Sequence, residues 1–213
     1  ASDVYKRQDV KIYENFYIEQ KLTNGSTVRF FKNRKDVDKV CLMKGRMPEK
    51  SGEIAVDRMY AENNSLEIGD RVKSGKKSFR ITGLVALSDY SALFQNNNDT
   101  MFDSVKFGVA IVRDKDFEAL NQVKLQYNYA WVYDKKPETE KKEKKMAEDL
   151  MEDMADVVTI ESFVPQYQNQ SIHFTGDDMG SDRAMIVMLL YIVMAILAFV
   201  FLSLIHISEP TRP

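Results

Sequence analysis

The sequence predicts an α+β domain followed by one membrane-spanning helix, and three observations lead to this class. The run Ala184–Ile205 contains no charged residue, and at about 1.5 Å per residue it would span roughly 33 Å, enough for a hydrocarbon core of about 30 Å. The residues before this run are polar, charged and patterned like a folded domain. Within that domain, a β-rich half precedes a half in which strands alternate with helices.

The first β-prone run is Asp9–Leu22, in which Val10, Ile12, Phe16 and Ile18 alternate onto one face. Asn24-Gly25 separates it from Ser26–Phe31. Both turn residues accept a positive φ, so this arrangement predicts a β-hairpin.

A short strand is expected at Lys39–Met43, where Cys41 is interpreted as a small buried hydrophobe rather than a reactive thiol. The following stretch, GRMPEKSGEIAVDRMYAENNSLEIGDRV, covers Gly45–Val72 and opens a small β-rich module. Its expected elements are a loop punctuated by Gly45, Pro48 and Gly52, a strand at Glu53–Val56, a short helix capped by Asp57 and ending near Asn63, core residues Leu66 and Ile68, and strands at Arg71–Lys73 and Ser78–Ala86.

The second half has the order strand, helix, strand, helix, strand, which is typical of a mixed α+β unit. After a loop at Ser88–Thr100, its expected elements are a strand at Val105–Val112, a helix at Asp114–Val123, an aromatic strand at Gln126–Tyr133, a helix at Glu138–Asp156 and a strand at Val157–Val164. Apolar residues recur at helical spacing in the second helix, at Met146, Leu150, Met154 and Val157. The run Lys141–Lys145 could bind phosphate or lipid headgroups, but its interleaved acids favour a solvated helix face.

Composition excludes several classes of function. A formal net charge of −2 argues against a nucleic-acid partner. Cys41 is the only cysteine, and His173 is the only histidine apart from His206, so disulfides, a cysteine- or histidine-based metal site and a Ser-His-Asp triad are poorly supplied. No GxxxxGK[ST] motif is present, so the sequence has no P-loop.

Two groups of residues are candidate sites. Asp177-Asp178, near His173, could support metal binding or acid–base chemistry, although adjacent carboxylates before an apolar helix are more typical of a solvated linker. Tyr127, Tyr129 and Trp131 could form a stacking platform, although half-buried sheet packing is the commoner reason for such alternation. The sequence therefore predicts no catalytic, cofactor-binding or metal-binding residue, and no enzyme.

Both ends of the sequence resemble a translated transposon-end sequencing adapter. Leu202–Arg212 (LSLIHISEPTR) is similar to one strand of that adapter, and Ala1–Gln8 (ASDVYKRQ) is similar to the other. The expected division is an adapter-like segment at residues 1–8, a domain at 9–165, a linker at 166–183, a transmembrane helix truncated to 184–201, and a second adapter-like segment at 202–213.

Two stretches resemble the FtsX/MacB-like permease family of bacterial ABC transporters, closest to Gram-positive members. The first is Gly45–Val72 with Phe79–Phe94: a Gly-Arg-x-Pro turn, then Gly-Glu-Ile, then Leu-x-Ile-Gly-Asp. The second is Asp177–Phe201, similar to the entry of that family into its second transmembrane helix. The resemblance implies a MacB-like periplasmic core domain, with residues 9–183 outside the cell membrane.

The resemblance also implies the function and partners. The chain would be a fragment of a non-enzymatic permease subunit, coupling ATP hydrolysis by a separate ATPase chain to export or to mechanotransmission. Its partners would be that ATPase, a second permease subunit and the lipid bilayer, with no cofactor and no nucleic acid. The alternative is a membrane-anchored extracytoplasmic sensor or ligand-binding domain.

Overall fold

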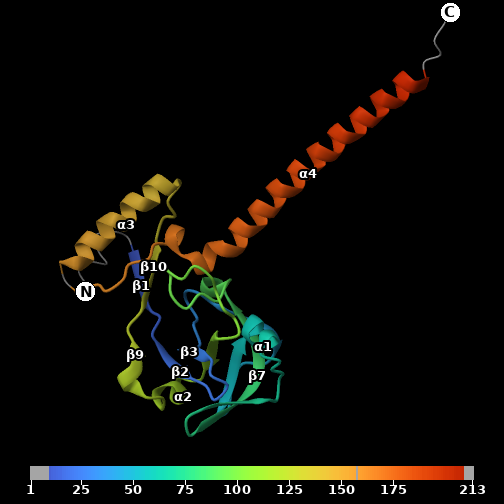
Figure 1. Ribbon diagram of the computed structural model, residues 1–213. Helices are drawn as coiled ribbons and strands as arrows, with labels where there is room; N and C mark the ends of the chain where they lie inside the picture. The colour runs from blue at the N-terminus through green and yellow to red at the C-terminus, as the bar shows by residue number, and fades with distance from the viewer. Residues whose placement is uncertain (1–9, 157, 209–213) are drawn as a thin grey trace, which may run out of the picture. The chain divides into compact units, whose positions relative to one another are not determined.

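The computed structural model (Figure 1) describes residues 10–156 and 158–208, with only the backbone described for 175–181 and 206–208. The chain divides into two compact units, Ala1–His173 and Phe174–Pro213. The first unit combines strands with helices, which confirms the predicted α+β class.

The first unit is built on two sheets. The strands are β1 (Val10–Glu14), β2 (Tyr17–Lys21), β3 (Thr27–Lys32), β4 (Val40–Gly45), β5 (Glu53–Asp57), β6 (Arg71–Ser74), β7 (Lys77–Leu87), β8 (Phe107–Val112), β9 (Leu125–Gln126) and β10 (Tyr129–Tyr133). The larger sheet has the order β4-β7-β5-β8-β3-β2-β9, and β6 pairs with the first part of β7. The smaller sheet consists of β1 and β10, which run antiparallel with Val10 opposite Tyr133.

The predicted hairpin is confirmed between β2 and β3, where Lys21 pairs with Thr27 and Gly25 adopts a φ of +87°. The run predicted as one strand breaks in two, because the chain leaves β1 at Asn15 and enters a different sheet as β2. Periodicity continues across this break, so the sequence pattern alone does not reveal it.

The predicted β-rich module and the α+β half share one sheet. β5 pairs in parallel with β7 and antiparallel with β8, which in turn pairs in parallel with β3. All residues of β5 and of β8 are buried. Strands buried on both faces are expected at the centre of such a sheet.

Helix α1 (Arg58–Asn63) follows β5 directly, and Asp57 caps it by accepting a hydrogen bond from the Tyr60 amide at 3.1 Å. This confirms the predicted cap. The Tyr60 ring is fully buried, and its hydroxyl lies 2.7 Å from Ser26 Oγ. The cap therefore also fixes the helix that places Tyr60 over the hairpin.

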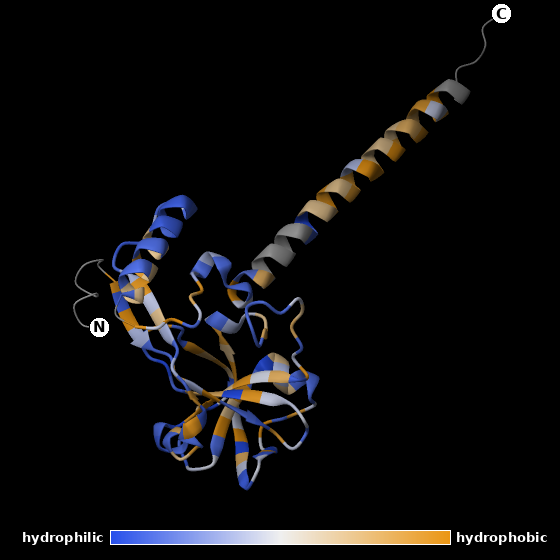
Figure 2. Ribbon diagram, turned by 60° about the vertical axis from the view of Figure 1, so that its left-hand side comes forward, coloured by the Kyte–Doolittle hydropathy of each residue, from blue (hydrophilic) through white to orange (hydrophobic). Residues whose placement is uncertain are grey.

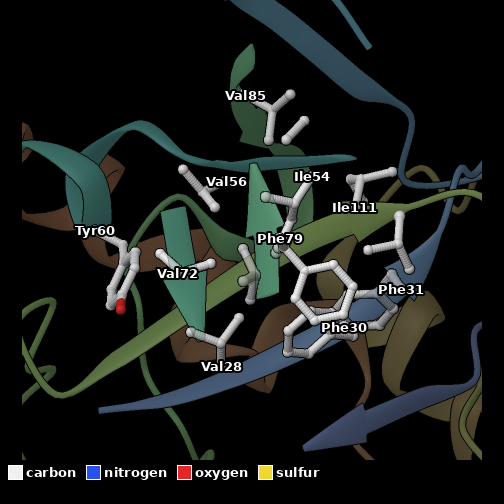
Figure 3. Packing of buried hydrophobic residues seen from close by; sticks show 14 of the residues in the cluster. Val28, Phe30, Phe31, Ile54, Val56, Tyr60, Val72, Phe79, Val85 and Ile111 are labelled. Carbon is white, nitrogen blue, oxygen red and sulfur yellow. The ribbon is translucent and has the colours of Figure 1, made fainter. Parts of the chain in front are cut away.

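The core is formed mainly by side chains from β2, β3, β5, β6, β7 and β8 together with Tyr60 (Figure 3). The rings of Phe30 and Phe79 meet with centroids 5.5 Å apart, joining β3 to β7. Ile54 and Ile111, on β5 and β8, have no exposed surface.

Strand β4 corrects one prediction. Cys41 is exposed, and so are its neighbours Leu42 and Met43, because β4 lies at the edge of the sheet. Ile68, predicted to enter the core, keeps 40% of its surface exposed, whereas Leu66 packs against the core.

The second half departs from the sequence prediction at three places. The helix expected at Asp114–Val123 is split into α2 (Asp114–Glu118) and a 3₁₀ turn at Gln122–Lys124. The strand expected at Gln126–Tyr133 is divided between β9 and β10, which belong to different sheets. The strand expected at Val157–Val164 is wrong: residues 158–164 pair with no strand, and Val157 lies outside the described residues.

Two helices complete the structure. Helix α3 (Glu140–Ala155) confirms the predicted amphipathic helix, with Thr139 as its cap and Leu150 buried. Helix α4 (Gln170–Ser208) has 39 residues, so most of the expected linker is helical. Within it, Asp182–Ile205 is long and apolar enough to cross a membrane, and Figure 2 shows mostly apolar colours beyond the hydrophilic start of this segment.

Candidate functional site

The first turn of α4 is held by the loop that follows β7. Asn97 Oδ1 accepts a hydrogen bond from the Gln170 amide at 3.1 Å, and Asn169 Oδ1 accepts one from the Ser171 amide at 3.0 Å. The Ser91 hydroxyl donates to the carbonyl of Ser171 at 2.5 Å. The Ala92 amide donates to the same carbonyl at 3.1 Å. We call these contacts the α4 anchor.

The loop side of the anchor is itself fixed in the core. Leu93 and Phe94 are buried, and the carbonyl of Gln95 accepts a hydrogen bond from Arg29 at 2.9 Å. Arg29 also pairs with Glu19 at 2.6 Å. A displacement of the first turn of α4 would therefore move the loop through these hydrogen bonds, and the loop is bonded in turn to Arg29 on β3.

Arg29 is held on several sides. Its guanidinium lies 4.2 Å from the ring centroid of Tyr17 and donates to the Tyr90 hydroxyl at 2.5 Å. Burial raises the pKa of the Tyr90 hydroxyl to about 12, so this group stays neutral near pH 7. The Glu19 carboxylate and the Tyr90 hydroxyl both bind this one guanidinium, so the network holds the structure together rather than forming a reactive centre.

A second buried pair lies beside the same loop. Arg34 donates to both carboxylate oxygens of Asp89, at 2.6 and 2.8 Å, and also to Asn15 Oδ1 at 3.1 Å. Burial, and then the negative charge of Asp89, raise the pKa of the nearby Asp38 to about 6.

The Gly-Arg-x-Pro and Gly-Glu-Ile segments form a clasp, which we define as Gly45, Arg46, Glu53 and Gly83. Arg46 holds the Glu53 carboxylate through two hydrogen bonds, at 2.8 and 2.5 Å. The amides of Glu49 and Lys50 donate to the same carboxylate. The hydrogen bonds from Arg46, and then those from the two amides, lower the pKa of Glu53 well below its usual range.

The two glycines of the clasp lie where a side chain would collide with a backbone carbonyl oxygen. Gly45 has a φ of +79°, and a Cβ there would lie closer than 3.0 Å to the Thr82 carbonyl oxygen. A Cβ on Gly83 would collide in the same way with the Arg46 carbonyl oxygen. The Arg46 amide donates to the Thr82 carbonyl at 2.9 Å, which binds the loop to β7.

The Leu-x-Ile-Gly-Asp segment is also structural. The Glu67 amide donates to Asp70 Oδ2 at 2.8 Å, and the Gly69 amide donates to the Ile81 carbonyl at 2.8 Å. Ile68 reaches the space beside Gly45. The segments that carry the family resemblance thus stabilise one module rather than line a reactive centre.

A cleft of about 1030 Å³ lies within the first unit. One wall is Asn128–Tyr133, another includes Ser162–Gln166, and a third belongs to the loop that carries Gln95–Asn98. Trp131 and Phe163, which belong to two of these walls, stack on each other with ring centroids 4.7 Å apart. The lining is rich in carboxamides and aromatic rings.

The structure places the candidate site residues of the sequence in separate surroundings. Tyr127 and Tyr129 both contact the Phe16 ring edge-on and stay largely exposed, whereas Trp131 is half-buried. The ring of His173 bonds to the Gln166 carbonyl at 2.8 Å, and the side chains of Asp177-Asp178 lie outside the described residues. Among the residues that the structure describes, no group of three or more His, Cys, Asp or Glu could hold a metal ion.

The sequence predicts only a loop at Ser88–Thr100 and does not reveal the α4 anchor. The run Asn96–Asn98 carried a signal, since asparagine is a preferred helix-capping residue. Which helix it would cap could not be deduced, because the contact joins residues far apart in the chain.

Comparison with known proteins gives distant similarities. No family model and no curated protein matches the chain. It is similar to the crystal structure of the extracellular domain of the noncanonic ABC-type transporter YknZ from Gram-positive bacteria, with 14% identity and a TM-score of 0.37, covering 72% of this chain and 81% of that one. It is also similar to the periplasmic region of MacB from Actinobacillus actinomycetemcomitans, with 12% identity and a TM-score of 0.37, covering 75% of this chain and 82% of that one.

Proposed function

We propose that this chain is part of an ABC transporter permease subunit of the FtsX/MacB type. Its first unit works outside the cell membrane and couples ATP hydrolysis by a separate ATPase chain to export or to mechanotransmission. The subunit itself is not an enzyme, and it assembles with a second permease subunit in the lipid bilayer. Because the similarities to solved structures are distant, the proposal rests on the residues of the chain itself.

The observation that carries the proposal is the joint presence of the clasp and the α4 anchor in one chain. Arg46 and Glu53 of the family-like segments form a single bonded unit on β7. Further along, α4 begins at Gln170 in contact with the loop after β7, and its helical backbone continues into the apolar segment Asp182–Ile205. A helix without a break supports transmission of force, since each turn is bonded to the next.

The anchor supports a specific route for this coupling. A shift of the membrane segment along its axis would pull on the Gln170 amide and the Ser171 carbonyl. Asn97 and Ser91 would carry that displacement into the loop. Arg29 would carry it on into β3. Small shifts at packed elements are typical of such switching.

The test is reconstitution of the full-length subunit with its ATPase in lipid nanodiscs, with a fluorophore on the exposed Cys41. We expect ATP to change the emission. Asn97→Ala, which removes the acceptor for the Gln170 amide, should reduce this change while ATP hydrolysis continues, because the Ser91 and Ala92 contacts to Ser171 are left in place. Asn97→Asp keeps an acceptor and serves as the matched control. A subunit that assembles with no ATPase would contradict the proposal.

The cleft favours a second candidate function, that of a membrane-anchored sensor or ligand-binding domain. Its volume of about 1030 Å³ is just above the range typical of ligand sites, about 300–1,000 Å³. A signalling module after the apolar helix in the full-length gene would favour the sensor. Further membrane segments and a neighbouring P-loop gene would favour the permease.

A further inference from the structure

The unpaired edge of β10 is the feature that the proposed function does not use. In an antiparallel pair, residues that face each other alternate between exchanging two hydrogen bonds and exchanging none. The Asn15 amide donates to the Asn128 carbonyl at 2.8 Å, and these two residues continue the register of β1 and β10. The bonded partners of β1 on this strand are therefore Asn128, Ala130 and Val132.

The other residues of β10 direct their backbone away from β1. Tyr129, Trp131 and Tyr133 each point an amide and a carbonyl to the outer edge of the strand. Between residues 10 and 208, leaving out Val157, no hydrogen bond joins these groups to another residue, and β10 pairs with β1 alone. Three donors and three acceptors are thus in a row.

This edge faces the cleft. Successive side chains of a strand point to opposite faces, so a cavity over one face is lined by alternate residues. Here six consecutive residues, Asn128–Tyr133, line the cleft. Because residues from both faces of β10 line this cavity, the cavity lies along the edge of β10 rather than over one of its faces.

We propose that the β10 edge is a binding site for an extended polypeptide segment, which adds as a further strand. Donors and acceptors that repeat every second residue, about 6.8 Å apart, match the backbone of another strand. A neutral oligosaccharide could use the carboxamides of the cleft, but it has no groups that repeat at this spacing. The backbone edge is what favours a peptide.

The walls specify the side chains of the segment. Tyr129, Trp131 and Tyr133 share one face of the strand, so alternate residues of the segment meet aromatic rings and are apolar. Of the charged lining residues, Arg29 and Asp89 are already committed to internal ion pairs. The other charges of the lining have both signs, so the segment is uncharged.

The site is independent of any ATPase, so the test uses the full chain alone in detergent micelles. The probe is the blocked peptide acetyl-Ser-Val-Thr-Ile-Ser-Val-Thr-amide, and the readout is the emission of Trp131, the only tryptophan. In an added strand, alternate amides of the peptide point toward β10. N-methylation of either the odd-numbered or the even-numbered amides, whichever set points toward β10, should weaken binding at least tenfold. N-methylation of the other set of amides, which points away from β10, should change binding less than twofold. Equal effects of the two sets would overturn strand addition.

A pair of protein variants tests the same edge. Trp131→Pro removes an outward amide without removing a bond to β1, and Trp131→Val loses the ring but keeps that amide. With binding followed by fluorescence anisotropy of a labelled probe, Trp131→Pro should bind at least tenfold more weakly than Trp131→Val. If Trp131→Pro fails to fold, the methylated peptides still decide.

Two other occupants are outcomes of the test. Residues 158–164 lie beside the cleft, and hydrogen-exchange protection of the Trp131 amide in the free chain would show that this segment already covers the edge. Binding of chitotetraose without binding of the peptide would show a glycan site. Either result would overturn the proposal.

Discussion

The guanidinium of Arg34 binds both carboxylate oxygens of Asp89, and both side chains are almost entirely buried, with 6% and 12% of their surface exposed. Arg34 also lies 4.8 Å from the ring centroid of Phe31. The pair joins the chain after β3 to the loop that holds the α4 anchor. It therefore connects the core to the segment proposed to transmit force.

Removing one partner of this pair should be costly. Arg34→Met leaves the Asp89 carboxylate buried and unpaired, and we expect a loss of about 3–5 kcal/mol in the free energy of unfolding. The double variant Arg34→Met with Asp89→Leu should recover most of this loss, because the Asp89 carboxylate is no longer left buried without its partner. Urea unfolding followed by circular dichroism measures both, and a double variant no more stable than Arg34→Met would contradict the explanation.

The clasp glycines provide a test of close packing. Gly83→Ala places a methyl group against the Arg46 carbonyl oxygen, and we expect a loss of about 2–4 kcal/mol. Gly25→Ala is the matched control. Gly25 has a positive φ, which Gly83 does not, but it has no atom within 4 Å of the added Cβ, so the expected loss comes from backbone strain alone and is only about 1 kcal/mol. Thermal unfolding of the two variants should separate them clearly; equal losses would show that the collision at Gly83 is relieved.

The cap of α1 should make stability depend on pH. Burial raises the pKa of Asp57 to about 6, above its value of about 3.9 in an unfolded chain. The folded state then binds the proton more tightly, so this group lowers the free energy of unfolding as pH rises from about 4 to about 6.

Asp57→Asn keeps an oxygen that can accept from the Tyr60 amide but removes the charge. Relative to the parent chain, this variant should gain on the order of 2 kcal/mol between pH 4 and pH 7. Asp57→Ala, which also loses the cap, should fall below Asp57→Asn by about 1 kcal/mol. Unfolding curves measured across this pH range test the sign, and a difference that does not change with pH would refute the assignment to Asp57.

The apolar segment of α4 should insert into membranes only while its centre is uncharged. Met194 lies near the middle of Asp182–Ile205, and Met194→Arg should cost about 2.5–3.5 kcal/mol of insertion free energy. Met194→Leu is the control of similar volume. Resistance of the full chain to extraction from membranes by alkaline carbonate is the measurement, and equal resistance of the two variants would speak against a spanning role.

Local signals in the sequence predicted the elements well where a local interaction decides them. Asn24-Gly25 produced the β2–β3 hairpin, and Asp57 produced the start of α1. Both depend on residues close together in the chain. The apolar segment of α4 was predicted for the same reason, since length and composition alone define it.

Features decided by the order of strands could not be predicted in this way. Cys41 is exposed because β4 is an edge strand, and Val158–Val164 is rich in β-prone residues but pairs with no strand among the described residues. The α4 anchor needs Asn97 beside Gln170, a contact that no local pattern contains. For the candidate site, the residue types could be read from the sequence, but which residues contact one another depends on the fold.

The pairing of Val10 with Tyr133 has a consequence for biosynthesis. The first strand finds its partner only after most of the unit has been made, and the α4 anchor forms later still. Contacts of such long sequence separation slow folding, because closing the long loop between the two residues costs conformational entropy before the contact stabilises anything. During synthesis the segment Val10–Glu14 therefore has no strand partner until Tyr129–Tyr133 has been made. If the unit crosses a membrane, it would do so as an unfinished chain and close into its final form on the far side.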